Sequence, residues 1–246
     1  MEKKNIETFI KKYSLGGLIE QVRWVIKDKT VRVTSMTSDK KFLTNVVMKD
    51  FDVADTEIGV MSSAKFKQMI GALTEKINWT TVFDETDTTR VTGVDISDDK
   101  TEISVMSADL DVIGAEPKLK TIPSFDVEIT LTEDFVSRFL KAKSALPESD
   151  LFTLNMSKKK QKLELVIGYN KNNSNRISLD VPAAPGKDTV KSPISFSAKN
   201  LKEILAVNPE GKDPVLKVSE AGLAFVEFDQ DGFQSQYYMI KIEVED

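Results

Sequence analysis

Two residue types that carry much of protein chemistry are missing from this chain of 246 residues, which has no cysteine and no histidine. The lack of cysteine excludes disulfide bonds and thiolate nucleophiles, and it suits the reducing environment of a cytoplasm. The lack of histidine excludes a serine–histidine–aspartate triad, a histidine metal site and a histidine general base. An enzyme would have to rely on Asp, Glu, Lys, Ser or Tyr. Because no convergent carboxylate motif is evident, catalysis is the weakest functional class.

Long apolar runs are also missing. The chain contains no run of 18 apolar residues, so we expect no membrane span. The first residues read Met-Glu-Lys-Lys-Asn and no apolar stretch follows, which predicts no signal peptide. The 40% hydrophobic and 30% charged residues are typical of a globular protein, and the length allows one large domain or two smaller ones.

Four segments have the apolar spacing of amphipathic helices: residues 5–14, 63–77, 132–145 and 197–207. In the first, Ile6, Phe9, Ile10 and Tyr13 follow the i, i+3, i+4, i+7 rule of a buried helix face. The third and fourth begin at plausible N-caps, and acidic residues in the third suit the positive end of the helix dipole. The caps are Thr132 and Ser197, and the acidic residues are Glu133 and Asp134.

The outer faces of these helices are basic although the whole chain carries a net charge of −5. The four segments hold ten basic and five acidic residues, so they sum to +5 and the remainder carries −10. Such asymmetry produces a local positive field on an otherwise acidic protein, and lysine can contact phosphates without a fixed geometry. We therefore expect these residues to face nucleic acid: Lys11, Lys12, Lys65, Lys67, Arg138, Lys141, Lys199 and Lys202.

Between the helices the pattern alternates with period two or forms short apolar runs, which indicates strands. In the first half we expect them at residues 23–26, 30–33, 42–48, 79–83, 90–96 and 102–106. In the second half we expect them at residues 152–156, 162–167, 176–181, 214–218, 223–228 and 236–244. Trp24 and Trp79 fall in apolar strand patterns and are predicted core residues. Two helices and a run of strands in each half predict an α+β fold with an internal duplication.

A connector separates the two halves. Residues 114–127 contain one glycine and two prolines, which favours an extended segment, although Leu119, Ile122 and Phe125 give it unusual apolar bulk. The expected domains are residues 1–113 and 128–246. Residues 182–187 are predicted to form a second loop. The connector and the Tyr238–Ile240 tail either pack together or leave a groove for a partner's peptide, and the residues alone leave both interpretations open.

We interpret the charged stretches of the sequence as turns that bind no ligand. The acidic stretches at residues 84–87 and 95–99 lack the central glycine and terminal glutamate of a calcium loop, so they are predicted to be turns. The lysine-rich stretch at residues 158–162 is predicted to be a solvated hairpin turn. We therefore expect no metal and no cofactor.

Several stretches, in order, resemble DNA polymerase sliding clamps of the proliferating cell nuclear antigen family. Residues 108–114 read Ala-Asp-Leu-Asp-Val-Ile-Gly and are similar to the Leu-Asp-Val region before that family's connector. Residues 222–228 and 237–243 resemble its last hairpin, where a Tyr-Tyr pair precedes Leu-Ala-Pro-Lys-Ile-Glu, although this chain lacks that proline. The length and residues 50–54 are similar to the clamps of T4-type phages.

The resemblance implies a processivity factor without enzymatic activity, found in the cytoplasm, or in that of a bacterial host if phage-encoded. Three subunits would form a ring whose four helices per subunit line a hole, with the sheets outside, around double-stranded DNA of any sequence. It would tether a DNA polymerase and be opened by a clamp-loader ATPase. The resemblance places partner binding at Phe42, Ile122, Pro123, Phe125, Tyr238, Met239 and Ile240. It places the subunit interface at Ile103, Val105, Ile177, Leu179 and Val181.

Two other interpretations stay open from sequence. A processivity factor of the same fold could bind DNA by charge as a monomer or dimer without closing a ring, which a native mass would detect. A β-rich virion structural protein would carry the basic helices incidentally and would assemble independently of DNA.

Overall fold

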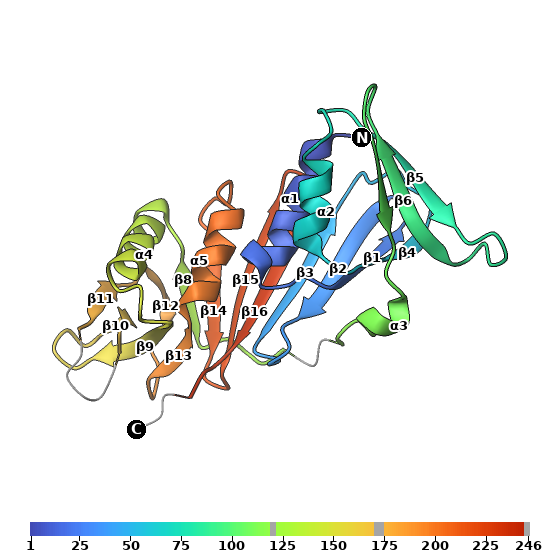
Figure 1. Cartoon of the computed structure of the whole chain (residues 1–246). Coiled ribbons are helices and arrows are strands. Elements are labelled where there is room, and N and C mark those ends of the chain that lie inside the picture. The colour runs from blue at the N-terminus through green and yellow to red at the C-terminus, as the bar shows by residue number, and fades with distance from the viewer. Residues whose placement is uncertain (119–121, 170–174, 244–246) are drawn as a thin grey trace. The chain divides into compact units, whose positions relative to one another are not determined.

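The computed structural model describes residues 1–118, 122–169 and 175–243 (Figure 1). The chain divides into two compact units. The first comprises Met1–Thr37, Leu43–Lys118 and Asp229–Ser235, and the second comprises Ser38–Phe42, Leu119–Phe228 and Gln236–Asp246. The main division therefore falls inside the expected connector. In its described part the connector has no helix or strand before Val127, where β8 begins, and Leu119 lies outside the described residues.

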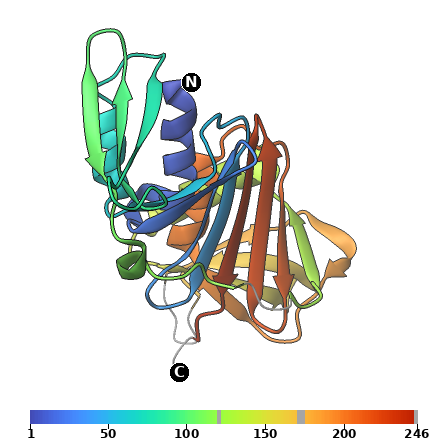
Figure 2. The ribbon, with the colours of Figure 1, turned by 90° about the vertical axis from the view of Figure 1, so that its right-hand side faces the viewer.

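The first unit contains two helices of at least two turns and seven strands. Its elements are α1 (Lys3–Ser14), the 3₁₀ turn Leu15–Gly17, β1 (Val22–Lys27), β2 (Thr30–Met36), β3 (Phe42–Met48), β4 (Thr56–Val60), α2 (Ser63–Ile70), β5 (Asn78–Phe83), β6 (Val91–Ser97), β7 (Glu102–Met106) and the short helix α3 (Leu110–Ile113). Its strands are ordered β3-β2-β1-β4 and β5-β6-β7, with antiparallel pairing throughout. Figure 2 shows the second of these sheets standing beside α1 and α2.

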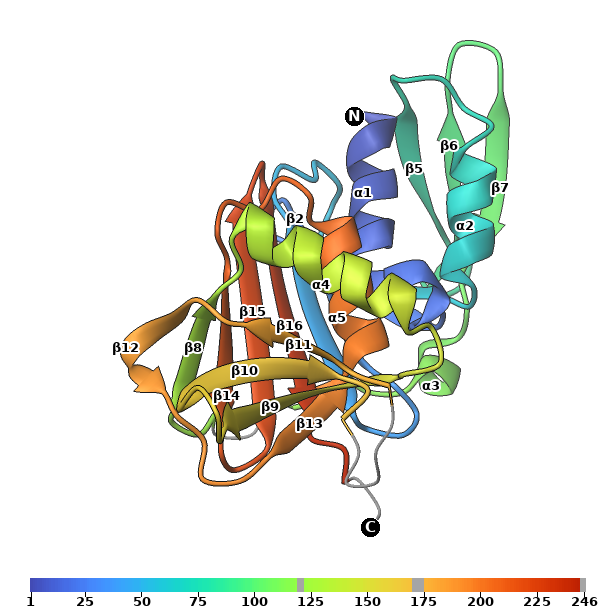
Figure 3. The same ribbon diagram turned by 90° about the vertical axis from the view of Figure 1, so that its left-hand side faces the viewer.

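The second unit repeats this plan. Its elements are β8 (Val127–Thr130), α4 (Glu133–Ala145), β9 (Leu151–Ser157), β10 (Lys162–Ile167), β11 (Ile177–Asp180), β12 (Ala183–Asp188), β13 (Ile194–Ser197), α5 (Ala198–Val207), β14 (Val215–Ser219), β15 (Leu223–Gln230) and β16 (Phe233–Ile240). One run of neighbouring strands is β11-β10-β9-β13, and another is β12-β8-β14-β15-β16. Figure 3 shows α4 beside α5.

The internal duplication is visible in the strand order. The run β3-β2-β1-β4 matches β11-β10-β9-β13, and β5-β6-β7 matches β14-β15-β16. The bridge between Glu2 and Lys76, just before α1 and β5, occupies the place that the pairing of β8 with β14 holds in the second unit. Among the described strands, β12, which pairs with β8, has no counterpart in the first unit. The predicted α+β class and its two similar halves are confirmed.

The predicted elements are largely present, and the differences have local causes. The hairpin of β1 and β2 turns through Asp28 and Lys29, both with positive φ, as a two-residue hairpin turn requires. Helix α2 spans Ser63–Ile70, the amphipathic stretch of segment 63–77, and residues 71–77 lie beyond it. Four short strands were not predicted, namely β4, β8, β12 and β13. The expected loop at residues 182–187 is wrong, because β12 pairs there with β8 across an irregular register despite its proline and glycine.

Helix starts follow the predicted capping chemistry. The Thr132 hydroxyl accepts a hydrogen bond from the N–H of Phe135 at 3.2 Å, and the Ser197 hydroxyl accepts one from Asn200 at 3.1 Å. Ser62 does the same for Lys65 at 3.3 Å. The predicted stripe of α1 is fully buried, as are Phe135 and Phe139 of α4 and Leu201 and Ile204 of α5. This burial fixes which helix faces remain outside.

Trp24 of β1 holds the core of the first unit together. Its ring lies 5.1 Å from that of Phe9 on α1 and 5.3 Å from that of Phe66 on α2, both measured between centroids. It also stacks on Trp79 of β5 at 6.1 Å, and its indole N–H donates to the Tyr13 hydroxyl at 3.3 Å. One buried side chain thus contacts both helices and both sheets of this unit, so a large aromatic is needed there.

We expect Trp24→Ala to reduce the free energy of unfolding by about 3–5 kcal/mol, because it removes a fully buried side chain and opens a cavity. Urea unfolding followed by circular dichroism measures this change. Phe83→Ala is the matched control, since Phe83 is 40% exposed and its loss should cost less than about 1 kcal/mol. Equal costs would contradict this account of the core.

Candidate functional site

Helix α1 presents a basic ridge opposite its buried stripe. Lys11 is exposed, as predicted. Lys4 is exposed too and lies seven residues earlier, which places both on the same helix face. Sequence reasoning missed Lys4 because it started the helix at residue 5. The signal available was the i, i+7 spacing of the two lysines.

Lys12 is a correction to the predicted set. It is only 1% exposed, and its ammonium lies 5.6 Å from the centroid of the Phe233 ring. The apolar stripe alone placed Lys12 on the flank of α1. Residues 229–235 belong to the first unit and cover that flank, so the buried arc of the helix is wider than its apolar stripe. In this arrangement Lys12 does not present its charge to a ligand.

Helix α2 carries its two lysines as predicted. Lys65 is exposed and Lys67 is half-buried. Phe66, between them in sequence, points into the core against Trp24. Within the part of the chain that the structure describes, neither lysine has an ion-pair partner, so both charges remain available.

The helices of the second unit differ in how free their charges are. Lys141 of α4 and Lys199 and Lys202 of α5 are exposed. Arg138 is half-buried and forms an ion pair with Asp134 at 2.7 Å, one turn earlier. Its guanidinium lies 6.0 Å from the centroid of the Phe135 ring. Arg138 therefore contributes less to the field outside the helix than the three lysines do.

These lysines suit binding without sequence recognition. A lysine ammonium is a flexible point charge that can follow a phosphate without holding one geometry. Phosphate contacts position a nucleic acid and carry no base information. Each unit thus offers two adjacent helices whose outward charge is mainly lysine.

The strands predicted to meet between subunits are sheet edges. Among the described strands, β7 pairs only with β6, and β11 pairs only with β10. Ile103 and Val105 of β7 are partly exposed, and so is Ile177 of β11. Leu179 is buried. Val181 lies just beyond the end of β11. An open edge offers a row of backbone donors and acceptors to another strand.

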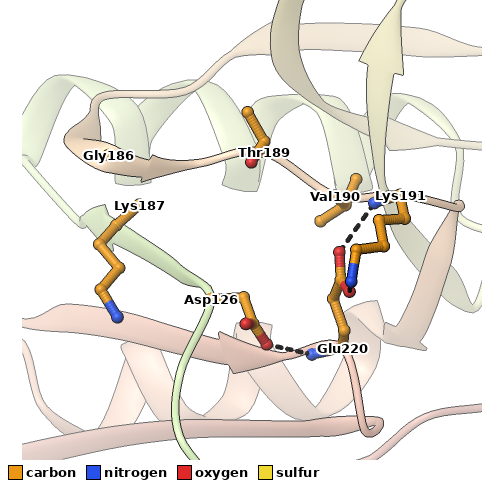
Figure 4. A pocket seen from close by; sticks show the side chains of 7 residues that line it. All are labelled: Asp126, Gly186, Lys187, Thr189, Val190, Lys191 and Glu220. Carbon is orange, nitrogen blue, oxygen red and sulfur yellow. Dashed lines mark hydrogen bonds and ion pairs between the residues drawn. The ribbon is translucent and has the colours of Figure 1, made fainter.

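The end of the connector is fastened to the second unit. The ammonium of Lys187 on β12 donates a hydrogen bond to the backbone carbonyl of Phe125. The next residue, Asp126, accepts a hydrogen bond from the N–H of Glu220 at 2.8 Å, and the Glu220 carboxylate also holds Lys191 (Figure 4). These contacts border a hollow of about 310 Å³. Residues 125 and 126 therefore have a fixed backbone position.

The predicted partner residues divide into buried and exposed ones. The Phe125 ring stacks on Phe225 with centroids 6.0 Å apart, and Phe225 lies 4.8 Å from the buried ring of Tyr238. Burial raises the pKa of the Tyr238 hydroxyl, and the nearby Glu227 carboxylate adds to the shift. Phe125 of the connector and Tyr238 of the tail therefore both pack against the ring of Phe225.

Three of these seven predicted partner contacts are not available on the surface. Phe42 and Met239 are each 1% exposed, and Tyr238 is also buried. Met239 points inward because alternate residues of a strand face the core, whereas Tyr238 lies on the opposite face of β16 and is buried against Phe225. Phe42 stacks on Tyr237 at 6.3 Å. Pro123 and Phe125 are half-buried. Ile122 and Ile240, each 43% exposed, remain as apolar surface residues.

The acidic turns use their carboxylates within the fold. Asp98 accepts hydrogen bonds from the backbone N–H groups of Lys100 and Thr74, among others, and these lower its pKa to about 2. Asp84 accepts from the side chain and backbone of Thr86, which lowers its pKa as well. Both groups serve as turn acceptors.

No helix among the described residues is long and apolar enough to cross a membrane.

Comparison with known structures identifies the fold. No protein-family model matches the chain, and no curated protein matches it in sequence. A crystal structure of proliferating cellular nuclear antigen from Entamoeba histolytica matches it with a TM-score of 0.71. The match covers 98% of this chain and 96% of that one at 16% sequence identity. This chain has the sliding-clamp fold. At such low identity the likeness establishes the fold alone.

Placing Met239 in the core changes what its substitution should do. We expect Met239→Ala to lower the free energy of unfolding by about 2–5 kcal/mol, because a fully buried side chain is removed. Ile240→Ala, one residue on, should cost less than about 1 kcal/mol. Chemical denaturation of both variants makes the comparison. A stable Met239→Ala protein would mean that this side chain is exposed in solution.

Proposed function

We propose that this protein is a DNA sliding clamp, a homotrimeric ring that encircles duplex DNA and holds a replicative polymerase on it. The observation that carries the proposal is the match of nearly the whole chain, in both units, to a proliferating cellular nuclear antigen. The exposed lysines on the helices of each unit support it independently of that match. The clamp acts by topology and hydrolyses nothing, and a clamp-loader ATPase opens the ring.

The DNA contacts in this proposal are the exposed or partly exposed basic residues of the four helices other than Lys3, whose ammonium donates to the Leu73 carbonyl. They are Lys4, Lys11, Lys65, Lys67, Arg138, Lys141, Lys199 and Lys202. A protein that slides needs weak, interchangeable phosphate contacts, and closure of the ring supplies the residence time. The acidic remainder of the chain repels DNA and so favours contact through the helices.

The subunits join through β7 of one copy and β11 of the next. This contact uses different surfaces on the two partners and generates a closed ring when the rotation between copies fits. Ile103, Val105 and Ile177 supply apolar side chains beside the paired backbones. Closure would also cover two edges that otherwise invite aggregation.

The polymerase and the loader bind by an apolar peptide near the end of the connector. The exposed Ile122 and Ile240 are the candidate contacts, while the aromatic packing of Phe125 supports the surface beneath. A peptide of this size binds weakly because its ordering opposes association, and three sites per ring add avidity.

Sedimentation equilibrium and a polymerase stimulation assay separate this proposal from its alternatives. Sedimentation equilibrium should give a mass of three times 27.5 kDa. A monomer or dimer that still stimulates a polymerase would indicate a processivity factor that does not close. Assembly into large particles without DNA would instead favour a structural protein of a virion.

Edge pairing makes a prediction for two neighbouring residues, Ile177 and Ser178. Adjacent residues on a strand direct their N–H groups to opposite sides, so one of the two faces β10 and the other faces the open edge. Proline removes the N–H. We expect one of Ile177→Pro and Ser178→Pro to become monomeric while keeping its urea midpoint, and the other to lose stability. Two variants that both remain trimeric and stable would move the interface elsewhere.

The basic helices make a separate prediction. Reversing Lys11, Lys141 and Lys202 to Glu together should leave the fold and the trimer unchanged, because all three are exposed. The half-life of the loaded ring on circular DNA should fall by about tenfold or more at 0.1 M salt. The control is the reversal of Lys27, Lys100 and Lys158, of which the first ends β1 and the other two lie in turns, all three being exposed. Similar losses in both triple variants would mean that the helices are not the DNA-binding surface.

A further inference from the structure

A second hollow lies in the first unit, and none of the residues lining it belongs to the basic helices α1 and α2. Its volume is about 810 Å³, and its walls come from the start of β4, the hairpin between β5 and β6, and the start of α3. None of the residues lining it belongs to β7, the strand proposed to meet the next subunit. The proposed clamp function gives this hollow no role.

One wall of the hollow is a strand edge with open backbone groups. Gly59 of β4 pairs outward with Ala108, whose N–H donates to the Gly59 carbonyl at 2.8 Å. Glu57 lies two residues earlier, so its N–H and C=O point to the same side, away from β1. The chain turns into α3 after Asp109, and that ends the pairing. Among the described residues, none bonds to these two groups of Glu57.

The same hollow has an apolar floor and an acidic rim. Phe83 is 40% exposed there, with Val91 and Leu110 also in the lining. Its charged lining residues are five acids and one base, namely Asp55, Glu57, Asp87, Asp109, Asp111 and Arg90. Arg90 lies 3.7 Å from Asp109, and Arg23 lies 2.8 Å from Glu57, so those two acids are already paired. Asp55, Asp87 and Asp111 leave a net negative field.

We propose that this hollow binds an extended, basic segment of a partner protein by adding a short strand to β4. The open backbone groups of Glu57 pair with the peptide main chain. Apolar side chains on one face of the peptide cover Phe83, and lysine or arginine on the other face meets the three unpaired aspartates. The site is separate from the surfaces proposed for polymerase and DNA, so loss of it leaves the clamp function intact.

The test uses a fluorescein-labelled heptapeptide in which valine and arginine alternate, titrated with the full chain and followed by anisotropy at low salt. We expect saturable binding below 1 mM. The triple variant Asp55→Asn, Asp87→Asn and Asp111→Asn keeps oxygen acceptors for the backbone hydrogen bonds that the Asp55 and Asp87 side chains accept, and it should bind at least about fivefold more weakly. The matched control is Asp52→Asn, Glu75→Gln and Asp99→Asn, three exposed acids outside the hollow, which should bind as the parent does.

Strand addition is tested apart from charge. A probe with the same side chains but N-methyl groups on alternate backbone nitrogens, on the edge that would face β4, should lose most of its affinity. The Phe83→Ser variant should also bind the parent probe more weakly. No saturable binding by the parent protein, equal affinity of the two triple variants, or equal affinity of the two probes would each overturn the proposal. The sedimentation mass stays unchanged in all these variants, which separates this result from a failure of ring formation.

Discussion

The arrangement of charge on this protein depends on the burial of four helix stripes. A helix that must bury Phe9 and Tyr13, or Phe135 and Phe139, has one orientation against its sheet. The lysines three, four or seven residues apart on the other side are then held outward without any contact of their own. An apolar constraint thus sets an electrostatic property, and substitutions that loosen the stripes would blur the positive surface as well as reduce stability.

Sequence patterns predicted most of the fold because the relevant signals are local. The apolar spacing of α1, the caps at Thr132 and Ser197, and the alternation of β3, β7 and β10 are all contained in short windows. The strands that were missed are short or irregular. In β12, Pro185 and Gly186 interrupt the sequence pattern of a strand, and the segment is extended because it pairs with β8. Pairing with a strand that is distant in sequence leaves no local periodicity.

Some residues of the candidate site were predicted correctly and others were not, because only some of the exposures depend on local sequence. The exposed positions Lys11, Lys141 and Lys202 follow from helix geometry alone. The burial of Lys12 depends on Phe233, more than two hundred residues later in the chain, and no window around Lys12 contains that information. Met239 and Tyr238 were expected at a surface from resemblance, but strand alternation turns Met239 into the core, and the ring of Phe225 covers Tyr238 on the opposite face of β16.

The composition of the first unit also has a consequence for how the chain is made. Residues 229–235 complete this unit: Phe233 covers Lys12, and the Gly232 carbonyl accepts the N–H of Lys49. A ribosome delivers α1 and β1 to β4 long before that segment. The unit encoded first is therefore completed only after most of the second unit has been made, and the flank of α1 stays hydrated until residues 229–235 have been synthesised. Vectorial synthesis thus couples the two units in time, and a chain cut short before residue 229 would leave even its amino-terminal half incomplete.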